Sequence, residues 1–260
     1  MRKNNNKKFG KRIKVNRPHG RAVPGIHSVK EVFEVRPHKV VELWLREGIS
    51  NNEAQKIIEK AEFSQIKVKF VTEMTLRDIN DTNQGIVAFV DEAPELDWQS
   101  LKSEEPAIYV CLDEIQDPHN LGAILRTSWL IGVKGVFVSA HKSNLLTPSA
   151  CKVACGGAEH VPVDAHTSLP NLLKELKKMN FWIYGLDMGG DHDLWSPKLT
   201  IPEKIVWVIG NEGKGLRKPI KNICDEIVHI KQTVSGASFN ASVATAMALS
   251  ETSRRLNLEG

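Results

Sequence analysis

From residue 107 to the C-terminus, short apolar segments alternate with longer segments of helical periodicity. The apolar segments predict strands at 107–112, 135–138, 160–163, 182–186, 204–209 and 226–230. The segments between them predict helices at 119–131, 148–154, 168–179, 216–223 and 239–256. Apolar strands that alternate with helices form parallel sheets that helices cover on both faces. This pattern constrains the fold more than any other feature, and it predicts an α/β domain over residues 107–260.

A smaller α/β unit, residues 23–90, precedes this domain. Its sequence predicts helices at 25–35 and 52–63, a third helix that Thr72 caps, and strands at 40–45, 68–71 and 85–90. Residues 91–106 separate the two units and contain six acidic residues, two prolines and little apolar periodicity. We therefore expect a linker at 91–106.

The N-terminal segment, residues 1–22, is strongly basic. It holds nine lysines and arginines and no acidic residue, whereas the rest of the chain carries 26 basic and 31 acidic residues. Few of its residues are apolar, so we expect a disordered tail whose charge favours a polyanion, most simply RNA. A solubilising tail or a start-site extension is the alternative. A mitochondrial transit peptide fits less well, because the segment has no serine and many asparagines.

Composition and patterning exclude several classes of protein. No apolar stretch approaches the roughly 18–20 residues of a membrane span, and no secretory signal pattern is present. The hydrophobic content of 41% is enough to fill a core. Cys111, Cys151, Cys155 and Cys224 are too scattered for a disulfide scaffold. We therefore expect free thiols and a cytoplasmic protein with no membrane partner.

Familiar nucleotide, metal and hydrolase motifs are absent from the sequence. The loop 210–215 (GNEGKG) follows a strand, but Leu216 stands where a phosphate-binding Walker loop needs Ser or Thr. Cys151 and Cys155 lie one helical turn apart without the second ligand pair of a zinc site, so we expect no metal. The segment 235–238 (SGAS) lacks the spacing of a serine-hydrolase elbow.

Three polar clusters instead interrupt apolar elements at their ends, at residues 117–127, 209–216 and 235–244. In the first cluster, Asn120 and Arg126 lie near a helix start, where free N–H groups and a guanidinium suit a phosphate. In the third, Ser238 and Asn240 are residue types that cap helices, which could be their whole role. Because loops at the carboxyl ends of parallel strands meet at one edge, the three clusters together predict one shared ligand site.

The clusters also carry a family resemblance. The segments NLGAILRT, IGNEGKGL and SGASFNASVATAMALSE resemble, in order and spacing, the three motifs of the SpoU (TrmH-type) branch of the SPOUT RNA 2′-O-ribose methyltransferases. The likeness runs from about residue 108 to 256. Residues 25–29 (GIHSV) and 83–86 (NQGI) resemble the L30e-like substrate-binding domain of one subgroup. With 117–122 and 152–159, the chain is most similar to the bacterial branch that methylates a guanosine of 23S rRNA.

The resemblance implies a catalytic domain with a deep trefoil knot that binds S-adenosylmethionine in a bent shape, and a homodimer in which an arginine of one subunit reaches the partner's site. The positions that match the family's cofactor contacts are Gly210, Ile230 and Phe239. The positions that match its active site are Asn120, Arg126, Glu212, Ser238 and Asn240. Phe239 replaces the usual Leu, and 231–232 (KQ) replaces Pro-Met, so the shape of the adenine pocket is expected to differ.

The residue types fit that chemistry. A sulfonium already activates its methyl group, so the protein must supply positioning and a nucleophilic ribose oxygen. Arginine is effectively always protonated, so we expect Arg126 to hold an RNA phosphate and to favour ionisation of the 2′-hydroxyl. Glu212 is expected to orient Arg126 or Asn120, although it is also a possible base. Asn240 and Ser238 would orient the ribose and hold the knot loop.

Two alternatives remain beside the 23S rRNA reaction. A tRNA ribose 2′-O-methyltransferase would use the same chemistry, but such enzymes generally lack the N-terminal unit. A non-catalytic RNA-binding assembly factor would not need Asn120, Arg126, Glu212 and Asn240 intact. No DNA partner is expected.

Overall fold

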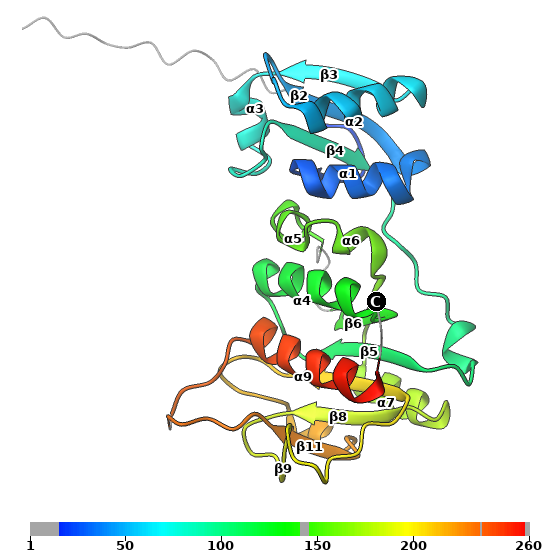
Figure 1. The fold of residues 1–260 in the computed structure, drawn as a ribbon, viewed down its shortest axis with the longest axis vertical. Coiled ribbons are helices and arrows are strands. Elements are labelled where there is room, and N and C mark those ends of the chain that lie inside the picture. The colour runs from blue at the N-terminus through cyan, green and yellow to red at the C-terminus, as the bar shows by residue number, and fades with distance from the viewer. Residues whose placement is uncertain (1–15, 141–145, 235, 258–260) are drawn as a thin grey trace, which may run out of the picture.

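The computed structural model describes residues 16–140, 146–234 and 236–257 and contains two sheets (Figure 1). A four-stranded sheet in the order β1-β4-β2-β3 belongs to the N-terminal part, and a seven-stranded sheet in the order β7-β6-β5-β10-β8-β11-β9 belongs to the C-terminal part. All pairings in the larger sheet are parallel, which confirms the fold class expected from the alternation. The smaller sheet is mixed, with β4 antiparallel to both β1 and β2.

The elements of the N-terminal part are β1 (Arg21–Pro24), α1 (Ile26–Val35), the 3-10 turn η1 (Pro37–Lys39), β2 (Val40–Arg46), α2 (Asn52–Phe63), β3 (Lys67–Val71), α3 (Glu73–Arg77) and β4 (Ile86–Val90). The turn η2 (Ser100–Lys102) follows in the linker. The C-terminal part contains β5 (Ala107–Leu112), α4 (Pro118–Ile131), β6 (Gly135–Ser139), α5 (Pro148–Ala154), α6 (Gly157–His160), β7 (Val163–His166), α7 (Leu169–Lys178), β8 (Trp182–Leu186), β9 (His192–Asp193), β10 (Lys204–Ile209), α8 (Lys218–Lys221), β11 (Glu226–His229) and α9 (Ala241–Leu256).

Helices cover both faces of the larger sheet because its strands are apolar on both sides. Alternate residues of β5 belong to different cores: Ile108 and Val110 lie in the core that includes α4 and α9 residues, and Tyr109 and Cys111 lie in the core that includes α7 residues. Every residue of β10 is buried, as expected for a central strand.

One expected strand is wrong. The structure has the short helix α6 at Gly157–His160, and β7 begins only at Val163, where residues 160–163 were expected to form the strand. Cys155 and Gly156 both adopt left-handed backbone, with φ of 50° and 106°, and this turn ends α5 and allows a new helical turn to begin. The expected helix 216–223 is likewise shorter, at Lys218–Lys221.

The basic tail lies mostly outside the described residues, because these begin at residue 16. Arg21 and Ala22, which we assigned to the tail, are the first residues of β1 and pair with Val90 and Phe89. Arg17 donates a hydrogen bond to the backbone oxygen of Asp78 at 2.7 Å. Among the helices of the described ranges, none is both long and apolar enough to cross a membrane.

The four cysteines are free thiols. Burial raises the pKa of Cys151 to about 11, and burial, with Asp225 nearby, raises that of Cys224 to about 12. Both thiols are therefore protonated at neutral pH, which makes them poor nucleophiles.

Residues 91–106, which we expected to form a linker, pack against the seven-stranded sheet. Leu101, in the 3-10 turn η2, is fully buried among residues of β5, α7 and β8. Lys204 donates its ammonium protons to the backbone oxygens of Leu101 and Ser103, at 3.2 and 2.7 Å. The Trp98 ring lies edge-on to His166 with the ring centroids 5.4 Å apart. The segment therefore docks on the sheet despite its low apolar periodicity.

Leu101→Ala should lower the free energy of unfolding by about 2–5 kcal/mol, because it opens a cavity in a dry core. Urea unfolding of the full chain measures the change. The control is Phe63→Ala, whose ring is 93% exposed and whose loss should change stability by no more than about 0.5 kcal/mol. Equal effects of the two substitutions would contradict the docking of the linker.

Candidate active site

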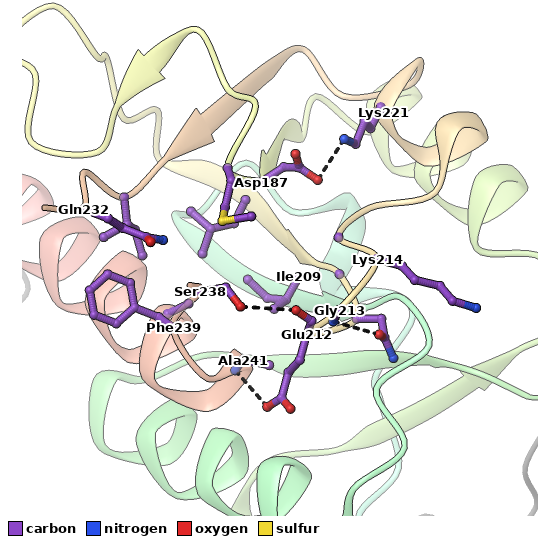
Figure 2. Close-up of a pocket in the computed structure, with 17 residues that line it drawn as sticks. Asp187, Ile209, Glu212, Gly213, Lys214, Lys221, Gln232, Ser238, Phe239 and Ala241 are labelled. Carbon is purple, nitrogen blue, oxygen red and sulfur yellow. Dashed lines mark hydrogen bonds and ion pairs between the residues drawn. The ribbon is translucent and has the colours of Figure 1, made fainter. Parts of the chain in front are cut away.

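A cavity opens at the carboxyl ends of β8 and β10, beside the start of α9 (Figure 2). It encloses about 770 Å³, including open solvent at its mouth. Leu186, Ile209, Ile230, Phe239 and Ala244 supply its apolar lining. The loop 210–215 and residues Asp187, Met188, Lys221, Gln232 and Ser238 complete it. The three cofactor positions expected from the sequence, Gly210, Ile230 and Phe239, all line this cavity.

The loop at Gly210 folds back on itself so tightly that no side chain fits there. A Cβ on Gly210 would lie 2.3 Å from the carbonyl carbon of Gly215. Gly215 itself has a φ of 64° and is bridged to Asn211. Only glycine allows this close approach of two backbone segments, so the cavity is lined by backbone at Gly210 and Gly215.

Three of the expected active-site residues form one hydrogen-bonded cluster at the rim of the cavity. Asn120 and Asn240 donate their amide protons to the same carboxylate oxygen of Glu212, Oε1, at 2.8 and 2.7 Å. The Asn240 amide also lies 2.9 Å from Oδ1 of Asn120, and the backbone N–H of Ala241 lies 3.2 Å from Glu212 Oε1. Oε1 thus accepts three hydrogen bonds, so this carboxylate holds the two amides and the first turn of α9 in place.

Helix capping fixes the orientation of the two amides. Asn240 is the N-cap of α9, and its Oδ1 accepts hydrogen bonds from the backbone of Ser242 and Val243. Its amide nitrogen is therefore directed away from the helix, toward Glu212. Asn120 lies in the first turn of α4, which Asp117 caps, and its side chain is buried. Capping of α9 and assembly of the cluster are thus two roles of one Asn240 side chain.

Ser238 joins the cluster through the backbone, because its hydroxyl donates to the carbonyl oxygen of Glu212 at 3.3 Å. Figure 2 shows this bond and the bond from Ala241 on either side of Glu212.

Arg126 lies apart from the cluster. It is exposed on α4, six residues after Asn120, and six residues correspond to about 9 Å along a helix and a different helical face. Its Nη1 lies 3.6 Å from Sγ of Cys155. Among the described residues, no hydrogen bond or ion pair joins Arg126 to Glu212 or Asn240, so the expected orientation of Arg126 by Glu212 is not seen within one chain.

Sequence reasoning did not identify Asp187, which ties two loops of the cavity together. Its carboxylate accepts hydrogen bonds from the backbone N–H of Leu216 at 3.0 Å and of Gly189 at 3.1 Å, and it pairs with Lys221 at 2.9 Å (Figure 2). A Cβ on Gly215 would lie only 2.5 Å from Asp187 Oδ2. The sequence signal was a single acid directly after the strand 182–186, which is too common to single out.

The donors around Asp187 set its charge state. Burial alone would raise the pKa of its carboxyl, but the hydrogen bonds from Lys221, Leu216 and Gly189 outweigh burial and hold the pKa below its ordinary value. The group is therefore ionised at neutral pH. Among the described residues, no cluster of three or more His, Cys, Asp or Glu side chains could hold a metal ion.

Comparisons with known proteins agree with this arrangement. Residues 107–250 match the family described as "SpoU rRNA Methylase family", and residues 22–96 match "RNA 2'-O ribose methyltransferase substrate binding". The chain is 39% identical over 240 residues to the 23S rRNA (guanosine-2'-O-)-methyltransferase RlmB of Neisseria meningitidis, which covers 90% of this chain and 95% of that protein. It is 35% identical over 241 residues to the enzyme with the same description from Coxiella burnetii, over 90% of this chain and 96% of that protein.

Solved structures show the same fold. The SpoU methyltransferase AviRb from Streptomyces viridochromogenes, in complex with the cofactor AdoMet, superposes with a TM-score of 0.77 at 22% identity. The superposition covers 92% of this chain and 91% of that one. The TrmH/SpoU tRNA modifying enzyme of A. aeolicus covers only 61% of this chain, with a TM-score of 0.53.

Asp187→Asn should destabilise the cavity loops by about 1.5–3 kcal/mol at neutral pH, because an amide group in place of the carboxylate directs protons at other donors. The pKa of Asp187 is depressed by folding, so its contribution is present above the unfolded pKa and is lost as pH falls through the folded pKa. The stability difference between wild type and variant should therefore be constant from pH 7 to about pH 5 and shrink as the pH falls below about 4.

Urea unfolding across that pH range measures the difference. The control is Asp191→Asn, an exposed acid in the same loop. A difference that stays constant with pH would show that the Asp187 charge does not hold the loops.

Proposed function

This chain belongs to the SpoU rRNA methylase family, and we propose that it methylates the ribose 2′-oxygen of a guanosine in 23S rRNA. It is an RNA 2′-O-ribose methyltransferase that uses S-adenosylmethionine. The observation that carries the proposal is the convergence of the three motif segments, through Asn120, Glu212 and Asn240, on the rim of one cavity. Relatives that match along most of their length support the 23S rRNA guanosine as the substrate.

The cavity residues fit the cofactor. A flat, largely apolar adenine suits the wall that Ile209, Ile230 and Phe239 provide, and the backbone of the tight turn at Gly210 and Gly215 lines the same cavity. Phe239, 38% exposed at the wall, and Gln232 give this pocket side chains that differ from the family's usual Leu and Met. When bound, S-adenosylmethionine supplies a methyl group that its sulfonium has already activated.

The hydrogen-bonded cluster at the rim of the cavity and Arg126 must bind and activate the target ribose. We propose that the amides of Asn120 and Asn240 and the hydroxyl of Ser238 orient the target ribose, and that Glu212 keeps the amides in place through Oε1. The always-protonated Arg126 holds an RNA phosphate and stabilises the negative charge that develops on the 2′-oxygen. The proton then leaves to a phosphate oxygen or to water.

We further propose a homodimer in which Arg126 of one subunit completes the site of the other. Support comes from the separation of Arg126 from the cluster in one chain and from its exposure. The helix that carries Arg126, α4, and the helix that Asn240 caps, α9, also expose apolar side chains: Leu130 is 71% exposed and Val243 is 43% exposed. A second copy of the chain would cover such surface.

We propose that one domain binds the RNA and that the other carries out the methyl transfer. Residues 21–90, from the start of β1, form the L30e-like RNA-binding domain, 91–106 the linker and 107–260 the catalytic domain, whose C-terminal loops form the trefoil knot. The basic residues that precede β1 add phosphate contacts, and the reaction takes place in the cytoplasm.

Asn120→Ala and Asn240→Ala should each lower methyl transfer to 23S rRNA by about 100-fold or more, because each removes a group that positions the ribose in a closed site. Transfer of labelled methyl from S-adenosylmethionine to 23S rRNA, 16S rRNA and tRNA measures this, and 2′-O-methyl mapping locates the product. Asn171→Ala, on the exposed side of α7, is the matched control and should be unaffected.

The substrate comparison decides between the alternatives. Methylation of tRNA in place of 23S rRNA would identify the tRNA enzyme. RNA binding without any methyl transfer would identify the assembly factor and overturn the proposal.

Arg126→Ala and Asn240→Ala subunits should complement each other when mixed. If one site uses Arg126 from one chain and Asn240 from the other, each mixed dimer keeps one intact site, so equal mixing restores roughly a quarter of wild-type activity. Subunit exchange is verified first with differently tagged chains. No recovery after verified exchange would mean that both residues serve a site within one chain.

A further inference from the structure

The segment 152–160 (KVACGGAEH) lies between the two domains. It forms the end of α5, a tight turn and α6, and Figure 1 shows α5 and α6 between α1 of the N-terminal domain and α4 of the catalytic domain. The proposed chemistry assigns this segment no role. Its contacts on both sides are unusually close.

Two adjacent glycines allow these contacts. A Cβ on Gly156 would lie 2.3 Å from Cγ of Glu31 on α1. A Cβ on Gly157 would lie 2.6 Å from the carbonyl oxygen of Leu125 and 3.0 Å from the Cα of Arg126 on α4. On the α1 side the Glu31 side chain therefore lies directly against Gly156, and on the α4 side the backbone at Leu125 and Arg126 lies directly against Gly157.

A buried carboxylate holds the N-terminal domain on this segment. The side chain of Glu159, in α6, is 0% exposed and pairs with Arg21 of β1 and, at 3.5 Å, with Arg36 at the end of α1. Both arginines are themselves nearly buried, at 12% and 13% exposed. Burying a carboxylate is costly unless it is paired, so the domain must remain seated to supply the two cations.

Further polar contacts surround this pair. Ser28 Oγ donates to the backbone oxygen of Cys151 at 3.1 Å, and both residues are buried. His160 Nε2 lies 3.0 Å from a carboxylate oxygen of Glu31, and the His160 ring stacks on Trp129 of α4 at 4.2 Å. The interface thus includes directional hydrogen bonds beside its apolar contacts, and these bonds fix its register.

From these contacts we propose that Glu159 is a positioning residue that sets the RNA-binding domain in fixed register with Arg126. The inference rests on the proposed function. RNA held by the N-terminal domain then presents one ribose at the site that Arg126 serves. A displacement of the ribose by about 1 Å at such a site can lower turnover by about 100-fold. The contact of Glu159 with the N-terminal domain, next to α4, therefore controls the reaction although Glu159 does not touch the substrate.

Glu159→Gln tests the proposal, because the amide keeps the size of the side chain and removes the charge that pairs with Arg21 and Arg36. We expect kcat on 23S rRNA to fall by roughly 10- to 100-fold, while the Kd for RNA changes by less than about threefold. The affinity and stoichiometry of S-adenosylmethionine binding, measured by calorimetry, should be unchanged. Backbone hydrogen exchange in α1 and α6 should accelerate as the seat loosens.

The matched control is Glu175→Gln, which removes an exposed carboxylate paired with Lys178 on α7 and should change none of these quantities. If Glu159→Gln does not accumulate as folded protein, Arg36→Gln carries the same test, with a smaller fall in kcat in the same direction. If Glu159 only stabilised the fold, its substitution would leave a fraction of the protein unfolded, and the stoichiometry of cofactor binding would fall in proportion to kcat.

Three results would overturn the inference: accelerated exchange with wild-type kcat, unchanged exchange in both variants, or a fall in kcat explained by lost cofactor sites. Failure of the proposed function looks different. In that case the wild-type protein itself does not methylate 23S rRNA, whereas hydrogen exchange still reports whether Glu159 seats the domain.

Discussion

The Glu212 carboxylate is the interaction on which the site depends. One oxygen accepts hydrogen bonds from Asn120, 92 residues earlier in the chain, from Asn240, 28 residues later, and from the backbone at the start of α9. Without that acceptor the two amides would lose their common partner, and the first turn of α9 would keep an unpaired N–H group. One anion thus joins the starts of α4 and α9 to the loop after β10 at the rim of the cavity.

Glycine supplies the second constraint. The loop after β10 returns so closely that Gly210 meets Gly215 backbone to backbone, and Asp187 closes on the same turn from the neighbouring strand. The cavity therefore has walls of backbone as well as of side chain, which explains why residue types alone say little about what fits it. Phe239 lines this wall where the family usually has leucine, and both side chains are apolar.

Periodicity predicted the parallel sheet, because a strand buried on both faces leaves a continuous apolar run. It also predicted that polar strand ends would meet, and the structure brings Asn120, Glu212, Ser238 and Asn240 together. It could not predict Asp187 or Glu159, since a single acid has no pattern and its partners lie far away in sequence: Arg21 is 138 residues from Glu159. The misplaced strand at 160–163 has a local cause, because two consecutive left-handed residues restart a helix where the apolar pattern continues. The proposed knot and dimer were expected only from the family resemblance, because periodicity indicates neither.

The buried Glu159 carboxylate supplies a directional contact between the domains, which an apolar interface alone does not provide. Apolar surfaces attract without direction, so two domains joined only by them could slide by a fraction of a turn at little cost. A carboxylate held between two guanidinium groups loses its pairing as soon as either domain shifts, and the penalty for an unpaired buried charge is large. The same seat abuts α4 through a glycine, so a shift of the N-terminal domain reaches Arg126 as a displacement of backbone. An enzyme that must choose one ribose among thousands gains more from a fixed register than from added affinity, and a single buried glutamate is a small structural means of fixing it.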